Sequence, residues 1–116
     1  MASNVIFFGW NRAIPGRERM STQHFQEFVG YLEGLQKNGR IQSFDSIFLH
    51  LHGGDLNGFF LIKGEPAALD ALVASEEWEN HMMRAAVHLQ GSGMIRGACG
   101  ELAHARMNAW TKIIPS

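Results

Sequence analysis

The segment that most constrains the fold is NVIFFGWNR, residues 4–12, because it is apolar on both sides of an extended chain. Apolar side chains occupy its odd and even positions alike: Val5, Ile6, Phe7, Phe8 and Trp10. Successive side chains of a strand point to opposite faces of its sheet. A strand that is apolar in both directions is usually covered on both faces. The segment therefore predicts a central strand whose sheet is buried on both sides.

An amphipathic helix is predicted over residues 22–38. Its apolar side chains recur at intervals of three and four residues: Phe25, Phe28, Val29, Leu32 and Leu35. This spacing places them in one stripe along a helix. Ser21 or Thr22 is suited to cap the N-terminus, and Lys37 with Gly39 is suited to end the helix.

A hairpin is predicted next, from residues 40–52 and the return segment FFLIKG. The first segment alternates, so Ile47 points to one face of the sheet while His50 and His52 point to the other. GGDLNG supplies the turn residues between the two strands. The two histidines are thus expected to share one side of a strand.

A second helical region and a fourth strand complete the pattern. Pro66 is suited to the first turn of a helix. Ser75 is suited to be a second N-cap, because three glutamates follow it, and the helix that it begins is expected to end near residue 90. MIRGACG (94–100) predicts the fourth strand, and residues 101–114 form a short terminal helix in one interpretation. The order β-α-β-β-α-β predicts a single ferredoxin-like α+β domain over residues 1–116, with an antiparallel sheet and both helices on one face.

The other face of this sheet would be a large exposed apolar patch. The predicted elements leave no segment to cover it, so a second copy of the chain is the simplest cover. The sequence therefore predicts a homodimer formed through this face.

Composition narrows the classes of partner and compartment. A net charge of −1 gives no electrostatic footprint for nucleic acid. No apolar run is long enough to span a membrane. The one cysteine, Cys99, excludes an intrachain disulfide and fits a reducing compartment, so a cytoplasmic protein is expected. A lone cysteine without basic neighbours is more often a small buried hydrophobe than a nucleophile.

With these elements in place, the chain resembles the dimeric α+β barrel superfamily, which includes small antibiotic-biosynthesis-type monooxygenases and muconolactone-isomerase-like proteins. Several shorter runs resemble runs in small bacterial proteins of unassigned function. These runs are GW and PGRE within residues 9–18, GRI and SF within 39–44, HGGDLNGFFLIKG at 52–64, and ASEEW and RAA within 74–86. The resemblance implies a homodimer and a mostly apolar pocket between sheet and helices, often catalytic without a metal or organic cofactor. It implies no catalytic residue for this chain.

The main candidate site lies on the second long helix. Steps of about 100° per residue place Trp78 on the buried stripe and Glu77, His81, Arg84 and His88 together on its flank. His81 and His88 are the predicted catalytic residues, because histidine exchanges protons near neutral pH. In the alternative interpretation these side chains only mark the helix boundary, with Glu77 paired to His81 one turn on.

The further ligand-binding candidates are aromatic or cationic. Trp10 and Arg12 share the even side of the first strand, where the indole offers a flat surface and the guanidinium suits carboxylates. Trp78 and Arg84 of the second long helix and Arg96 of the fourth strand are the other candidates. Each of them can equally be a packing or surface residue. His50 and His52 are held in reserve as metal ligands, since a metal site needs at least one further ligand that the sequence does not place nearby.

Three functions remain open, and one of them is metal binding through His50 and His52. The first is a small-molecule-binding protein, acting as a cofactor-independent monooxygenase or isomerase on a small hydrophobic or aromatic compound. In this mechanism a histidine takes a proton from an acidic C–H or O–H group, and an arginine steadies the resulting charge. The second is a noncatalytic dimeric binding or stress-associated module in which the histidines are structural.

Overall fold

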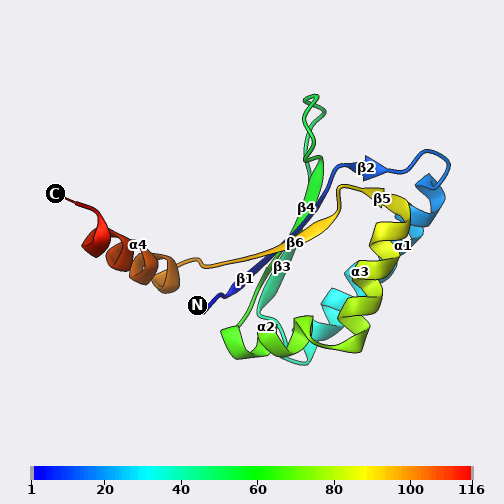
Figure 1. Cartoon of the computed structure of the whole chain (residues 1–116). Helices are drawn as coiled ribbons and strands as arrows, with labels where there is room; N and C mark the ends of the chain where they lie inside the picture. The colour runs from blue at the N-terminus through cyan, green and yellow to red at the C-terminus, as the bar shows by residue number, and fades with distance from the viewer. Residues whose placement is uncertain (1, 116) are drawn as a thin grey trace.

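Strand β1 (Val5–Trp10) lies at the interior of a four-stranded antiparallel sheet, as its apolar character predicts. The computed structural model describes residues 2–115 (Figure 1). The strand order is β3-β4-β1-β6, with β3 at Ser43–Phe48, β4 at Gly58–Lys63 and β6 at Gly93–Gly97. The prediction of a mixed α+β protein with an antiparallel sheet is confirmed.

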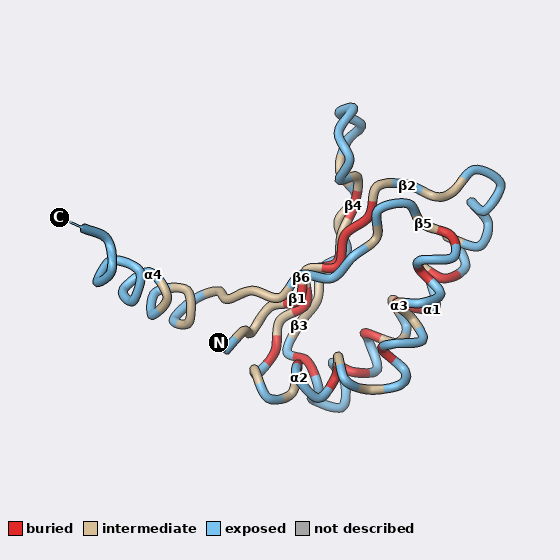
Figure 2. The backbone as a smooth tube through the Cα atoms, in the orientation of Figure 1, coloured by how far each residue is buried: buried red, intermediate tan, exposed pale blue. Residues whose placement is uncertain are grey.

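Three helices pack on one face of this sheet (Figure 1). They are α1 (Glu18–Lys37), α2 (Pro66–Val73) and α3 (Glu76–His88). We name the covered side the closed face. Its core is formed by large apolar residues from both layers: Ile6, Phe8, Trp10, Phe28, Leu32, Phe60, Ile62, Leu69, Leu72 and Trp78. Figure 2 shows this buried set along the strands and on the inner sides of the helices.

Two helix starts test the predicted caps. Ser75 caps α3, because its hydroxyl accepts a hydrogen bond from the backbone N–H of Trp78. The cap predicted for the first helix is wrong. That helix begins at Glu18, its N-cap residue is Arg17, and no side chain caps it. Ser21 consequently lies inside the first turn, where its hydroxyl is free to contact another element.

The element order is more complex than the predicted β-α-β-β-α-β. A short pair of strands, β2 (Arg12–Ala13) and β5 (Leu89–Gln90), forms a separate two-stranded sheet. The second helical region is split into α2 and α3, and a fourth helix, α4 (Glu101–Ile113), follows β6. Arg12 therefore does not continue β1 on the side of Trp10, because it belongs to β2 and is exposed.

The predicted strand at residues 40–52 is also shorter in the structure. Beyond β3, Leu49 still donates a backbone hydrogen bond to Asn57, but no strand pairing follows. His50 and His52 lie in the exposed loop of the hairpin, so they share no strand face. The physical reason is local, since His52 binds its own loop through the Leu56 carbonyl (2.6 Å) and the Gly54 N–H (3.2 Å).

The second side of the sheet, which we name the open face, is apolar. It carries Val5, Phe7, Ile47, Phe59, Leu61 and Ile95, as the strand register requires. Phe7 and Phe59 stack with ring centroids 4.8 Å apart. Ile95 is 63% exposed. Within the described residues of one chain, no helix packs over this face.

Helix α4 extends away from the rest of the chain (Figure 1), and none of its residues is buried. Its apolar side chains Met107, Trp110 and Ile113 are exposed, as is Ile114, the residue that follows the helix. Ala103, Met107, Trp110 and Ile114 follow spacings of four, three and four residues, which place them in one stripe. No helix among residues 2–115 combines the length and apolar character needed to cross a membrane.

Candidate functional site

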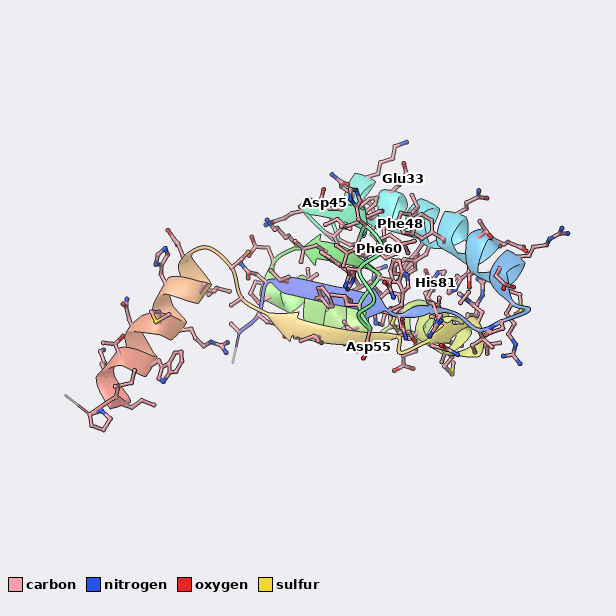
Figure 3. All side chains as sticks on the ribbon, turned by 90° about the horizontal axis from the view of Figure 1, so that it is seen from above. Glu33, Asp45, Phe48, Asp55, Phe60 and His81 are labelled. Atoms are coloured by element: carbon pink, nitrogen blue, oxygen red, sulfur yellow. The ribbon has the colours of Figure 1, made fainter. Side chains whose placement is uncertain are left out.

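A cavity of about 470 Å³ opens between the closed face of the sheet and helices α1 and α3. Its wall is mainly aromatic, with contributions from both layers: Phe8, Trp10, Phe25, Phe28, Phe48 and Phe60. In Figure 3, Phe48 and Phe60 lie on the side of the sheet that faces α1. A cavity of this size and lining is typical of sites for small organic molecules.

The aromatic wall is built by register and helical spacing. Trp10 of β1 lies opposite Gly58 of β4, and the absence of a side chain at Gly58 leaves room for the indole ring. Phe25 of α1 packs against Trp10 and Phe48, and its ring centroid lies 6.4 Å from that of Trp10 and 5.0 Å from that of Phe48. Phe48 is 65% exposed, so the wall extends from the buried core to the cavity mouth.

One end of the cavity is polar and contains a continuous chain of hydrogen-bonding side chains. Ser21 Oγ lies 2.6 Å from His88 Nδ1. His88 Nε2 lies 2.8 Å from His24 Nδ1, and His24 Nε2 lies 3.0 Å from His81 Nδ1. We name these four residues the histidine chain. Ser21, His24 and His88 line the cavity, whereas His81 lies at the far end.

Two helices supply the histidine chain. Ser21 and His24 are three residues apart on α1, and His81 and His88 are seven residues apart on α3, so each pair shares one helix face. Helices α1 and α3 pack side by side, which inserts His24 between the two histidines of α3. His24 and His88 are buried, at 5% and 4% exposure.

Burial keeps the three imidazoles neutral. It lowers the pKa of His24 to about 4, with a further contribution from the positive charge of Arg84. The pKa values of His81 and His88 are lowered by the same two causes, burial first and Arg84 second. At neutral pH the histidine chain is therefore uncharged, and its nitrogens can accept a proton.

Each nitrogen-to-nitrogen contact in the histidine chain holds one proton between two neutral rings, which leaves two directions of donation. In the first, Ser21 donates to His88, His88 to His24, and His24 to His81. In the second, every donation is reversed, and the Ser21 hydroxyl can turn to the His88 carbonyl at 3.4 Å. A change of direction moves one proton along the whole chain.

The rim of the site contains an exposed ion pair rather than the predicted cluster of polar residues. Arg84 of α3 pairs with Glu27 of α1, and Glu77 does not join them. Glu77 and His81 form no ion pair among residues 2–115, although the negative charge of Glu77 partly offsets the lowering of the His81 pKa. A smaller cavity of about 190 Å³ lies on this side and is bordered by Arg84, His24 and His88.

The structure separates the other predicted site residues. Trp10 lines the aromatic cavity, whereas Trp78 is a core residue with 2% exposure and does not line it. Arg12 is exposed on β2. Arg96 links β6 to α2 through Asp70, at 2.9 Å. No lysine or arginine is among the described residues that line the cavity, so the predicted arginine partner for a substrate anion is not in place.

Metal-ligand geometry is not present in the described part of the chain. No group of three or more His, Cys, Asp or Glu residues among residues 2–115 is arranged to hold a metal ion. Within the histidine chain, the two ring nitrogens of His24 point to two different neighbours and do not converge with them on one point. Cys99 is half-buried, and its backbone N–H binds Asn4.

Sequence reasoning did not find Ser21 and His24 as site residues. One signal was available for His24, which follows the same buried stripe of α1 as Phe28, Leu32 and Leu35. A polar residue in an apolar stripe needs a buried partner. Ser21 carried no such signal, because a serine before an apolar helix also fits an N-cap.

Comparison with known proteins adds no family assignment. Neither protein-family models nor curated protein sequences give a match to this chain.

Proposed function

We propose that this protein binds a small aromatic or hydrophobic compound in the cavity and accepts a proton from it through the Ser21–His88 end of the histidine chain. The observation that carries this proposal is a series of three neutral, hydrogen-bonded imidazoles, two of which, His24 and His88, line one end of an aromatic cavity. A neutral imidazole is a general base near neutral pH. The surrounding rings exclude water from the charge that forms.

Isomerisation is the reaction that this arrangement supports best. An isomerase takes a proton from one atom of its substrate and returns it to another, and a chain that can donate in either direction serves both steps. Cofactor-independent oxygenation remains the second candidate, since it begins with the same proton transfer and continues with dioxygen. Its support is the aromatic wall of the cavity beside the base.

We infer that the working form is a homodimer with a ferredoxin-like subunit, as in dimeric α+β barrel proteins. The strand order β3-β4-β1-β6 with α1–α3 on one face supports this subunit fold. The uncovered apolar residues of the open face, Ile95 among them, support association through that face. The exposed stripe of α4 supplies further apolar surface for the second copy.

Binding of 4-nitrophenol tests the proposed site, because its phenolate absorbs visible light. At a pH one unit below the pKa of free 4-nitrophenol, we expect the wild-type protein to bind the probe and to hold part of it as the phenolate, paired with protonated His88. His88→Gln should retain binding but lose this ionisation. Ala13→Phe, which fills part of the cavity lining, should weaken binding at least tenfold, whereas the exposed Ala86→Phe on α3 should not.

The outcomes separate the two functional classes. Binding without ionisation of the probe would favour the noncatalytic binding module, in which His81→Ala and His88→Ala change stability and nothing else. Absence of saturable binding by the wild-type protein would contradict the proposed site.

A further inference from the structure

Ser21 can do more than take part in the proposed proton transfer. Its Oγ lines the aromatic cavity and lies 2.6 Å from the Nδ1 of His88. A hydroxyl within hydrogen-bonding distance of a neutral imidazole loses its proton to that base as it attacks a carbonyl carbon. The same contact that fixes His88 therefore activates Ser21.

The rest of the histidine chain meets the second requirement for such a nucleophile, a third group that orients the base. When His88 takes the Ser21 proton, the resulting imidazolium donates through both ring nitrogens. His24 Nδ1 accepts a hydrogen bond from His88 Nε2, and His24 donates its own Nε2–H to His81 Nδ1. All bonds then run away from Ser21, and each donation strengthens the next.

The start of α1 favours the negative charge that such an attack creates. Ser21 lies in the first turn of this 20-residue helix, and no side chain caps the preceding backbone N–H groups. The positive end of a helix dipole stabilises nearby anions. This contribution adds to the activation of Ser21 and is not itself the site.

We propose that Ser21 is the nucleophile of an acyl-transfer site, with His88 as its general base and His24 as the positioning residue. Ser21 Oγ bonds to the carbonyl carbon of an ester while its proton moves to His88 Nδ1. The ester C–O bond then breaks, and the His88 proton goes to the leaving alcohol. Water, activated by His88, releases the acid and restores the Ser21 hydroxyl.

The cavity defines the class of ester. Its aromatic wall suits an ester with an aromatic alcohol or acyl group, whose carbonyl reaches the polar end. The described residues that line it include Glu18 but no cationic side chain, so a neutral ester is favoured over an anionic one. This inference rests on the same cavity as the proposed function and adds a covalent step to it.

Covalent labelling of the unsubstituted protein tests the nucleophile directly. Phenylmethanesulfonyl fluoride carries an aromatic ring and reacts with activated serines through loss of fluoride. We expect intact-mass and peptide analysis to find one sulfonyl group, on Ser21. Hydrolysis of 1-naphthyl acetate, followed by the fluorescence of 1-naphthol, gives the catalytic readout.

Matched variants separate catalysis from structure. Ser21→Ala should lower hydrolysis at least 100-fold and abolish labelling, whereas Ser46→Ala, at an exposed serine of β3, should change neither. His24→Leu should lower kcat at least tenfold and shift the midpoint of the pH profile. His24→Gln, which keeps an acceptor for His88, should restore part of both.

A wild-type protein that is not labelled at Ser21, or a Ser21→Ala variant that hydrolyses the ester at the wild-type rate, would overturn this inference. The labelling uses the natural chain, so poor folding of a variant does not affect it. If 4-nitrophenol still binds and ionises in such a protein, the proposed proton-accepting site stands without the acyl-transfer step.

Discussion

The two faces of the sheet are formed by the same four strands, but only one of them is covered by helices. On the closed face, Phe60 packs against Phe25 and Phe28 of α1, and the buried histidines His24 and His88 bond to each other. On the open face, its chain neighbour Phe59 stacks on Phe7 without a covering helix. One chain therefore covers one face of its sheet with helices and leaves the other face uncovered. The closed face forms the wall of the aromatic cavity, and the open face leaves apolar side chains such as Ile95 exposed within one chain.

The largest contrast between the faces is expected from truncating these two neighbouring phenylalanines. Phe60→Ala should lower the free energy of unfolding by about 3–5 kcal/mol, because it leaves a cavity in a packed core. Phe59→Ala should cost less at low protein concentration, and its cost should grow as the concentration rises and copies associate. Urea unfolding at two protein concentrations measures both effects. Equal, concentration-independent losses would remove the distinction between the faces.

Charge on the open face should break the proposed dimer. Ile95→Lys places an ammonium group in the contact surface and should raise the dimer dissociation constant about 100-fold, which corresponds to ~2.7 kcal/mol. Met83→Lys is the matched control, since Met83 is similarly exposed (61% against 63%) but lies on α3. Sedimentation at micromolar concentration gives the readout. A monomeric wild-type protein would contradict the proposed assembly.

The closed face should be the acid-sensitive one. The pKa of His24 is about 4 in the folded chain and near 6.5 when unfolded. Between these values the unfolded chain binds more protons, so stability falls as the pH falls from about 6.5 toward 4. The loss attributable to His24 is at most about 3 kcal/mol. His24→Gln should flatten this part of the stability profile in urea titrations at several pH values, and an unchanged slope would assign it to other groups.

The smallest effect is expected at the rim of the closed face. Arg84→Gln breaks an exposed ion pair with Glu27 and should change stability by only about 0–1 kcal/mol. It should nevertheless raise the pKa values of His24, His81 and His88, because Arg84 lowers all three. Histidine side-chain NMR across a pH titration detects this change. Unmoved titrations would show that burial alone keeps the imidazoles neutral.

The candidate site was predictable to the extent that it depends on one helix. His81 and His88 were predicted from their shared flank on α3, and Trp10 from its place on the first strand. The same reasoning grouped Glu77 and Arg84 with the histidines, but Arg84 pairs across to α1. The angular position of a residue shows which face of its helix it lies on, but it does not show which other element packs against that face.

Local pattern by itself determined the elements of this protein. Apolar periodicity of 3.6 or 2 residues and turn residues located the central strand, the hairpin and the long helices, because each depends on neighbours in the sequence. The N-cap at Ser75 was determined in the same way. The limits of β3 and the separation of β2 from β1 were not, since strand pairing depends on partners elsewhere in the chain.

Only the tertiary structure brought the residues of the histidine chain together. Ser21 and His24 reach His88 and His81 across 57 to 67 residues of sequence, through the packing of α1 against α3. Moving any of these side chains by one position along its helix would turn it by about 100° and separate the ring nitrogens. Hydrogen bonds require contact within about 3 Å, and no spacing within a single helix specifies such a contact with another.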